Sequence, residues 1–292
     1  MRVNEIISTR EVKVNEIMST PVYTISASDT IARARNLMLK RKISRLVVTE
    51  EEKLIGMVTK SDLTQRLLQA EPSWRRRPID RIPVKLVMTE KPITIYPSAT
   101  PKQAAELMIE NNIRGLPVVE NERLIGIITA FDLVKWFANS KSQVKVNDIM
   151  SSTLVTVHRY HSINHVIDQM NENGVDRVIV VDGKGAPVGI ITLSDLAFID
   201  LNPERDLNKE LKLTRKSSPA GIKEYRYVKK VMLIAEDIMS SPLFTIESQA
   251  LATAAAKMIV EEDVDAITVK NGELLGMISK TDIVAAIARG EV

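Results

Sequence analysis

The stretch that decides the fold is GIITAFD, residues 126–132, which recurs in the chain as GMVTKSD from Gly56, GIITLSD from Gly189 and GMISKTD from Gly276. In every copy a hydroxyl residue follows the glycine by three positions, and an aspartate follows it by six. A second shared motif, in which a methionine lies six residues before a threonine, starts each unit at Met18, Met88, Met150 and Met239. The chain is therefore built from four internal repeats.

The second repeat shows the expected local structure most clearly. Residues 100–112 predict a helix with Thr100 as its N-cap and Pro101 as its first residue. The apolar runs 113–119 and 124–129, separated by the turn ENER, predict two paired strands. Asp132 is then expected to cap a helix over 132–138. The repeat thus reads as β-α-β-β-α, which gives the chain an α/β (α+β) fold.

Each repeat has about 55 residues, too few to bury a generous core alone. We therefore expect adjacent repeats to pair into two modules. The predicted repeats span 10–70, 84–138, 144–200 and 235–289, with linkers at 71–83 and 201–234.

The composition narrows the class of protein. The 292 residues include no cysteine, which excludes disulfides, cysteine–zinc sites and a thiol nucleophile. No apolar run approaches the roughly 18–20 residues of a membrane helix, and the N-terminal residues lack the apolar core of a signal peptide. We therefore expect a soluble, cytoplasmic protein without membrane association.

The net charge of +3 averages two unlike parts. The linkers 71–83 and 201–234 together carry +7, whereas the other 245 residues carry 27 basic and 31 acidic residues, a net charge of −4. Both linkers interleave aromatic residues with cations, as in Trp74 followed by Arg75–Arg77. That pattern suits single-stranded nucleic acid, although a solvated linker or a contact with a partner protein also accounts for it.

The repeated motifs resemble the cystathionine-β-synthase (CBS) domain, tandem pairs of which are called Bateman modules. The resemblance rests on the IMS/T start, the LPVV-like strand and the G-h-h-[S/T]-x-x-D ending, and it covers nearly all of the chain outside the linkers. The four-repeat layout is similar to stand-alone archaeal and bacterial CBS proteins and to the gamma subunit of AMP-activated protein kinase. The resemblance implies four CBS repeats paired into two Bateman modules.

The resemblance also implies an adenosine-type ligand, namely AMP, ADP, ATP or S-adenosylmethionine, bound in clefts between paired repeats. Its ribose contacts map to Asp62, Asp132, Asp195 and Asp282. Hydroxyl and phosphate contacts map to Thr59, Ser61, Thr129, Thr192, Ser194, Ser279 and Thr281. The adenine pocket maps to Ser19, Thr24, Ile43, Thr89, Thr94, Ile113, Ser151, Thr156, Val175, Ser240, Thr245 and Val264. The motif glycine is expected to let the ligand approach the backbone.

Phosphate recognition requires cations, and the resemblance places them at Arg45, Lys60, Arg114, Arg177 and Lys280. The second module also has Asp176 and Asp265 at the corresponding positions, and a carboxylate near a phosphate weakens binding. We therefore expect the first module to be the better nucleotide site. The second is expected to bind more weakly, or to prefer a ligand with a positive group such as S-adenosylmethionine.

The sequence supports three hypotheses about function. The first is a non-catalytic regulatory protein that senses an adenosine ligand and acts on a regulated protein not identified by the sequence, as a monomer or a homodimer. The alternative is an adenosine-ligand-regulated RNA- or DNA-binding protein that uses the basic linkers. Catalysis is the weakest reading, because the chain has no GxSxG motif or P-loop. His158, His161 and His165 lie outside the repeated motif, so we expect a solvated surface there and no metal.

Overall fold

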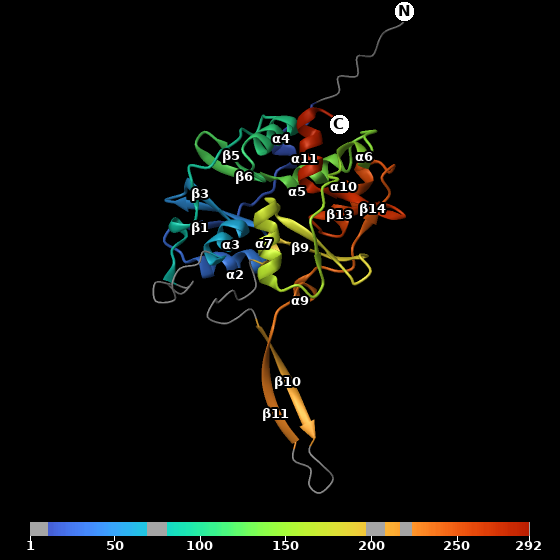
Figure 1. The fold of residues 1–292 in the computed structure, drawn as a ribbon. Coiled ribbons are helices and arrows are strands. Elements are labelled where there is room, and N and C mark those ends of the chain that lie inside the picture. Colours follow the sequence, from blue (N-terminus) through green and yellow to red (C-terminus); the bar gives the residue numbers. More distant parts are fainter. Residues whose placement is uncertain (1–10, 69–80, 197–207, 217–223, 292) are drawn as a thin grey trace, which may run out of the picture. The chain divides into compact units, whose positions relative to one another are not determined.

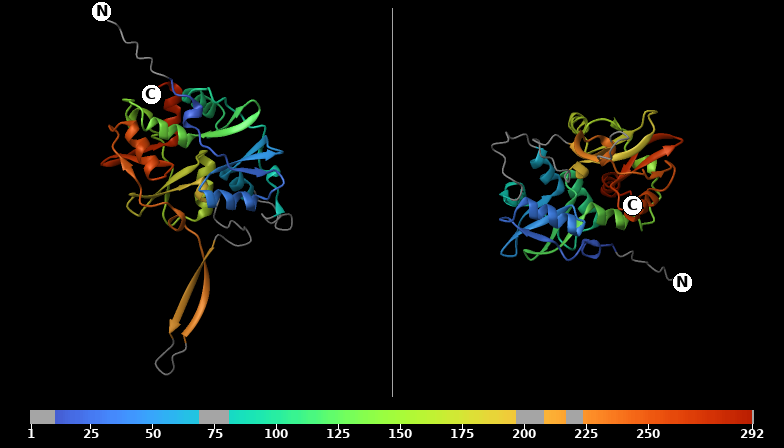
Figure 2. Two further views of the ribbon diagram at one scale, coloured as in Figure 1. Left: turned by 180° about the vertical axis from the view of Figure 1, so that it is seen from behind. Right: turned by 90° about the horizontal axis from the view of Figure 1, so that it is seen from below.

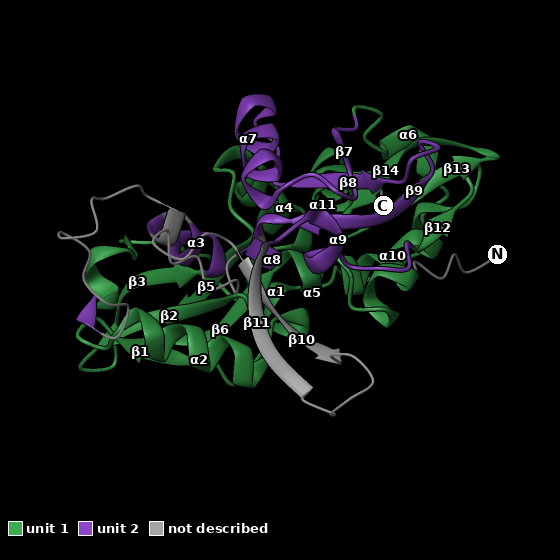
Figure 3. Cartoon of the chain, turned by 60° about the horizontal axis from the view of Figure 1, so that its bottom comes forward, with its two compact units in different colours: residues 1–59, 83–153, 244–292 green, residues 60–82, 154–243 purple. Residues whose placement is uncertain are grey.

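The computed structural model describes residues 11–68, 81–196, 208–216 and 224–291. The chain forms two compact units, drawn in green and purple in Figure 3. Unit 1 comprises residues 1–59, 83–153 and 244–292, and unit 2 comprises residues 60–82 and 154–243. The predicted linker residues 71–80 and 201–207 lie outside the described part of the chain.

The four repeats contain a similar succession of elements, except that repeat 2 opens with a 3-10 helix, η3, and has no strand equivalent to β1 among its described residues (Figure 1). Repeat 1 contains α1 (Val14–Ile17), β1 (Thr24–Ser26), α2 (Ile31–Arg41), β2 (Arg45–Glu50), β3 (Lys53–Thr59) and α3 (Lys60–Leu68). Repeat 2 contains η3 (Val84–Leu86), β4 (Thr89–Glu90), α4 (Pro101–Glu110), β5 (Gly115–Glu120), β6 (Arg123–Thr129) and α5 (Ala130–Phe137). Repeat 3 contains α6 (Val146–Ile149), β7 (Thr156–His158), α7 (Ile163–Asn173), β8 (Arg177–Val181), β9 (Pro187–Thr192) and α8 (Leu193–Leu196). Repeat 4 contains α9 (Ala235–Ile238), β12 (Thr245–Ile246), α10 (Ala252–Glu261), β13 (Ala266–Asn271), β14 (Glu273–Ser279) and α11 (Lys280–Arg289).

The strands of each repeat follow one pairing pattern. The first strand lies parallel to the second in β1–β2, β7–β8 and β12–β13. The second and third strands form an antiparallel hairpin in every repeat. In repeat 2 a single parallel bridge, Ile95 to Val118, takes the place of the first strand pair. The predicted mixed α/β fold of β-α-β-β-α repeats is confirmed.

The two predicted helices of repeat 2 had different outcomes. Helix α4 begins at Pro101, and its N-cap Thr100 accepts a hydrogen bond from the Gln103 backbone amide, as expected. The predicted start of the second helix was wrong, because α5 begins at Ala130 and its N-cap is Thr129. Asp132 occupies the third helical position and completes a capping box with Thr129.

The opening segment of each repeat pairs with the last strand of its neighbour. The Ser19 and Ile127 backbones exchange two hydrogen bonds, and β4 of repeat 2 pairs with β3 of repeat 1. Ser151 pairs in the same way with Met277, and Ser240 with Ile190. Repeats 1 and 2 are thus joined reciprocally, because the opening segment of each pairs with the last strand of the other. Repeats 3 and 4 are joined in the same way.

Each unit has its own apolar core. In unit 1, α11 packs against α4 and α5, and α10 packs against α5. The fully buried side chains there include Met108, Leu133 and Phe137. In unit 2, α3 packs against α8, and a smaller cluster gathers between α7 and the sheet of repeat 3. Among the described residues, no helix has the length and apolar character needed to cross a membrane.

The segment 201–234 contains regular structure that its polar sequence did not predict. Strands β10 (Asn208–Lys216) and β11 (Glu224–Met232) pair antiparallel over nine residue pairs, from Asn208–Met232 to Lys216–Glu224. They form a two-stranded sheet of their own, seen from two sides in Figures 1 and 2. The predicted linker between repeats 3 and 4 therefore contains a β-ribbon that the sequence analysis did not predict.

Candidate ligand-binding sites

The motif glycine faces a methionine of the paired repeat. A Cβ atom added at Gly56 would lie 2.8 Å from the Met88 sulfur, and one added at Gly189 would lie 2.5 Å from the Met239 sulfur. Gly126 meets Met18 in the same manner, and at Gly276 the nearest atom is the Ser151 carbonyl oxygen. The missing side chain therefore makes room for the opening segment of the neighbouring repeat, and the approach of a ligand to this glycine stays a prediction.

Asp132 lies where repeat 2 meets the opening segment of repeat 1. One carboxylate oxygen accepts hydrogen bonds from the Thr129 backbone amide at 2.8 Å and from the Thr129 hydroxyl at 2.6 Å. The other accepts a hydrogen bond from the Ser19 hydroxyl at 2.8 Å. The residue is 8% exposed. The structure thus brings together three predicted site residues from two repeats.

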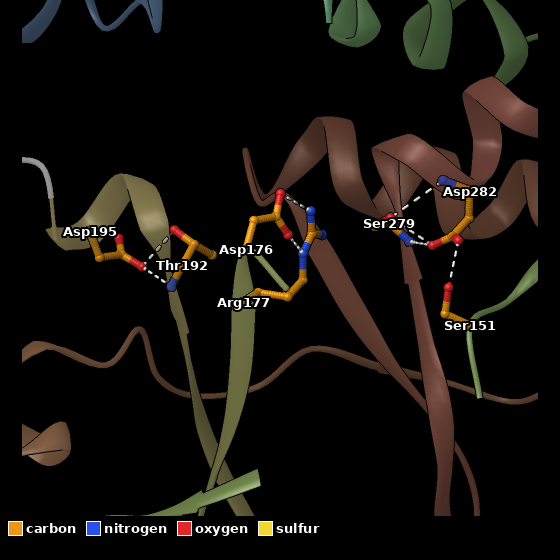
Figure 4. Close-up of polar contacts among 7 residues, drawn as sticks. All are labelled: Ser151, Asp176, Arg177, Thr192, Asp195, Ser279 and Asp282. Carbon is orange, nitrogen blue, oxygen red and sulfur yellow. Dashed lines mark hydrogen bonds and ion pairs between the residues drawn. The ribbon is translucent and has the colours of Figure 1, made fainter. Parts of the chain in front are cut away.

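Asp282 repeats this geometry in the pair formed by repeats 3 and 4 (Figure 4). Its carboxylate accepts hydrogen bonds from the Ser279 backbone amide at 2.8 Å and the Ser279 hydroxyl at 2.6 Å. The Ser151 hydroxyl donates to its second oxygen at 2.8 Å. Two sites that are far apart in sequence therefore share one hydrogen-bond pattern.

The remaining two aspartates belong to helices of unit 2. Asp195 accepts hydrogen bonds from the Thr192 amide at 2.7 Å and hydroxyl at 2.8 Å (Figure 4). Asp62 lies in the first turn of α3, three residues after Thr59, which ends β3. Ser61 is exposed on α3. The predicted Ser194 lies in α8, and its side chain is outside the described part of the chain.

The Arg45 side chain of repeat 1 contacts the backbone of repeat 2. Its guanidinium donates a hydrogen bond to the Arg114 carbonyl and covers Gly115, where a Cβ atom would collide with it. Desolvation, and then the nearby Arg114 charge, lower the pKa of Arg45 to about 10, whereas Asp132 and Asp265 raise it. The Arg45 Nε is buried and has no hydrogen-bond partner among the described residues. At pH 7 this cation remains charged.

The cations of repeats 3 and 4 lie against carboxylates. Within unit 2, Arg177 donates to both oxygens of its neighbour Asp176, at 2.8 and 3.2 Å (Figure 4). Within unit 1, the Lys280 ammonium lies 2.8 Å from an Asp265 oxygen and 5.1 Å from the centre of the Phe131 ring. Lys60 lies at the first position of α3. Arg177 and Lys280 therefore have part of their charge neutralised locally.

The residues predicted for the adenine pocket are all accessible to some degree. Exposed positions include Ser19, Thr24, Thr89, Thr94, Ser151, Thr156 and Ser240, and half-buried positions include Ile43, Ile113, Val175, Thr245 and Val264. One small surface pocket of unit 1 is lined by Ile113 and Arg114 of repeat 2 together with Thr281 of repeat 4.

The histidines gather at the start of α7. The rings of His161 and His165 are 4.3 Å apart between centres, and those of His158 and His161 are 5.9 Å apart. Desolvation, and then the neighbouring imidazoles, lower the pKa of His161. Among the described residues, no group of three histidine, aspartate or glutamate side chains has a metal-binding arrangement.

Sequence reasoning missed two features of these sites. The partner of each aspartate, Ser19 for Asp132 and Ser151 for Asp282, is more than 110 residues away in the chain. The position of Arg45 over Gly115 was also missed. The available signal was the alignment of the repeats, in which Gly115 stands at the position that holds Arg45 in repeat 1 and Arg177 in repeat 3.

The sequence matches the CBS domain family at residues 14–69, 77–139, 146–201 and 235–289. The chain belongs to the CBS-domain family. A curated relative, the uncharacterized protein MJ1404 of Methanocaldococcus jannaschii, is 28% identical over 285 residues, which is 94% of this CBS protein and 62% of the relative. The chain thus spans less than two thirds of that relative.

A solved structure and an enzyme are also similar to this CBS protein. The crystal structure of MJ1225 from the same organism, described as a candidate archaeal homologue of g-AMPK, superimposes with a TM-score of 0.75 at 21% identity, covering 95% of this chain and 100% of that one. This likeness shows a shared fold. The inosine-5'-monophosphate dehydrogenase of Korarchaeum cryptofilum is 39% identical over 113 residues, which is 38% of this chain and 21% of that enzyme.

Proposed function

We propose that this CBS protein is a cytoplasmic, non-catalytic regulator that binds an adenosine-containing ligand, AMP, ADP, ATP or S-adenosylmethionine, in clefts between paired repeats. The observation that carries the proposal is the geometry shared by Asp132 and Asp282. Each carboxylate lies at the start of a helix, beside a hydroxyl residue that ends a strand, and reaches a serine of the paired repeat.

This arrangement suits a nucleoside for electrostatic and geometric reasons. A carboxylate accepts hydrogen bonds from vicinal ribose hydroxyls, as acidic residues do in dinucleotide-binding folds. Near Asp132, the Arg45 and Arg114 charges lie close enough to lower the pKa of Arg45, and a bound anion would offset their repulsion. The first pair of repeats therefore suits a phosphorylated ligand. The carboxylates Asp176 and Asp265 suit a ligand with a positive group, such as S-adenosylmethionine.

Regulation requires that the ligand favour one arrangement of the chain over another. A ligand shifts such an equilibrium only by its difference in affinity for the two states. The proposed ligand site spans two repeats, because Ser19 and Asp132 come from different repeats. A ligand held there would therefore favour one relative position of these repeats, which a regulated protein could recognise.

The test is a thermal-shift panel on the full chain with AMP, ADP, ATP and S-adenosylmethionine, with GMP as the control for the base. A ligand at 100 times its Kd stabilises the folded state by about 2.7 kcal/mol, which gives a clear increase in Tm. Isothermal titration calorimetry then measures Kd for each ligand that shifts Tm. A panel in which no adenosine ligand raises Tm would contradict the proposal.

Asp132→Asn and Asp282→Asn form a matched pair for the same test. Asparagine keeps an oxygen acceptor for the capping box but removes the charge that favours two ribose hydroxyls. In calorimetry, we expect Asp132→Asn to lose ligand binding at the site of Asp132 and to keep it at the site of Asp282. We expect Asp282→Asn to show the opposite pattern. Two variants that both bind with wild-type stoichiometry and affinity would show that the ligand lies elsewhere.

A further inference from the structure

The β10–β11 ribbon lies outside the CBS repeats. The family match ends at residue 201 and resumes at residue 235, and both strands fall between these limits. The two strands hold seven basic and two acidic residues, a net charge of +5. The other 274 residues hold 33 basic and 35 acidic residues, a net charge of −2. The positive charge of the protein is therefore concentrated on one inserted element.

The register of the ribbon sorts these residues into two faces. Residues directly opposite one another in an antiparallel pair share a face, and alternate residues along a strand share a face. Leu213 is opposite Tyr227 and Arg215 is opposite Tyr225, so one face carries the odd-numbered positions. That face holds Lys209, Leu211, Leu213, Arg215, Tyr225, Tyr227, Lys229 and Val231.

The two faces differ in charge pattern. The odd-numbered face has three cations and both tyrosines of the ribbon, and it has no acidic residue. The even-numbered face has four cations, Lys212, Lys216, Arg226 and Lys230, together with both acidic residues, Glu210 and Glu224. Aromatic residues are therefore placed only among uncompensated cations.

We infer that the odd-numbered face of the β10–β11 ribbon binds single-stranded nucleic acid. Proteins that bind single strands combine cations, which contact the phosphates, with aromatic rings, on which bases stack. Tyr225 and Tyr227 are two positions apart on one strand, so their Cα atoms are separated by roughly 7 Å. In the register, Arg215 is opposite Tyr225, Lys229 follows Tyr227 by two positions, and Lys209 is opposite Val231 further along the same face. An acidic protein segment would use the charge but not the two aromatic positions.

The ribbon is long enough for several nucleotides. Nine residues in each strand extend over roughly 30 Å. This activity is separate from ligand binding in the CBS clefts, because the strands contain none of the proposed ligand contacts. The two proposals can therefore fail independently of each other.

The test measures fluorescence anisotropy of a labelled 20-nucleotide oligo(U) RNA with the full chain at 50 mM and higher salt. We expect binding whose log Kd changes with log salt with a slope of roughly two, as three phosphate contacts predict for a single strand. No binding at 50 mM salt would overturn the inference. Equally tight binding of polyglutamate, or of phosphatidylserine vesicles, would overturn it as well.

Two triple variants test the face, since each removes three positive charges. Lys209→Ala/Arg215→Ala/Lys229→Ala is expected to weaken RNA binding at least tenfold and to reduce the salt slope. The matched control, Lys212→Ala/Lys216→Ala/Lys230→Ala, is expected to weaken it less than threefold. Equal losses from the two variants would overturn the assignment to one face.

A double variant tests stacking. Tyr225→Ala/Tyr227→Ala is expected to weaken binding at least tenfold with an unchanged salt slope, because base–aromatic stacking contributes about 1–3 kcal/mol per base. Tyr225→Phe/Tyr227→Phe keeps the rings and is expected to retain binding within about twofold. A tenfold loss in the phenylalanine variant would contradict the stacking role.

Discussion

Arg45 and Arg177 stand at the same position of repeats 1 and 3, yet their surroundings differ. Arg45 lies beside Arg114, and its pKa is lowered to about 10 by desolvation and by that second charge. Arg177 donates to both oxygens of Asp176. The comparison teaches that one motif position can hold a cation beside a second cation in one repeat and a cation paired with a carboxylate in another.

The largest expected effect separates these two arginines. Arg45→Ala should weaken AMP binding roughly 10- to 100-fold, because a hydrogen bond to a charged group contributes about 1.5–3 kcal/mol. Its affinity for adenosine, which has no phosphate, should stay unchanged. Calorimetry with both ligands measures the difference.

Arg177→Ala is the matched control, expected to change the tightest AMP affinity less than about twofold. Equal losses from Arg45→Ala and Arg177→Ala would show that the two regions are equivalent. An equal loss of adenosine and AMP binding in Arg45→Ala would indicate a structural role for Arg45.

Ser19→Ala tests what the two regions share. The Ser19 hydroxyl donates to the second oxygen of Asp132, so it competes with a ribose hydroxyl for that acceptor. Without that competitor, adenosine should bind roughly two- to tenfold more tightly, in line with a net hydrogen-bond contribution of about 0.5–1.5 kcal/mol. Ser151→Ala should have a similar effect at Asp282, which has the same geometry. Weaker binding in either variant would show that the serine contacts the ligand, as the family resemblance implies.

Asp176→Asn is expected to make Arg177 resemble Arg45 more closely in its contribution to AMP binding. The change removes the carboxylate that neutralises Arg177, so AMP binding at the weaker class of site should improve by up to about fivefold. The gain should disappear at high salt, because the charges are screened. Calorimetry at low and high salt checks this, with Asp168→Asn on α7 as a surface-charge control. If the AMP affinity of the weaker class of site did not change, neutralisation of Arg177 by Asp176 would not explain why the two regions differ.

The smallest expected effect concerns pH and separates the two units. All three histidines of the chain belong to unit 2. The pKa of His161 is lowered in the folded state, so the unfolded chain binds a proton first as pH falls below about 6.5, and stability decreases there. His161→Asn should therefore show a smaller fall in Tm between pH 7 and pH 5.5 than the wild-type protein. An identical fall would place the pH dependence on other groups.

Much of the fold and part of the site could be predicted from local sequence. The Thr100 cap and the strand pair of repeat 2 follow from residues within about a dozen positions of one another. The same holds for Thr129 and Asp132, which form one capping box, although the helix start was misplaced by two residues. The β10–β11 ribbon was missed because its cations and short apolar pattern are equally typical of a solvated linker.

The sequence by itself determined the four repeats, the β-α-β-β-α order and the aspartate at each strand-to-helix junction, because fixed spacing and helix capping are local properties. Only the tertiary structure decided that Met18 fills the space over Gly126, that Ser19 meets Asp132 and that Arg45 covers Gly115. These contacts join residues about 70 to 110 positions apart, where no local pattern records which side chains meet. The physical reason is that each repeat buries its last strand against the start of its neighbour, and pairing of chain segments decides which charges and hydroxyls come together.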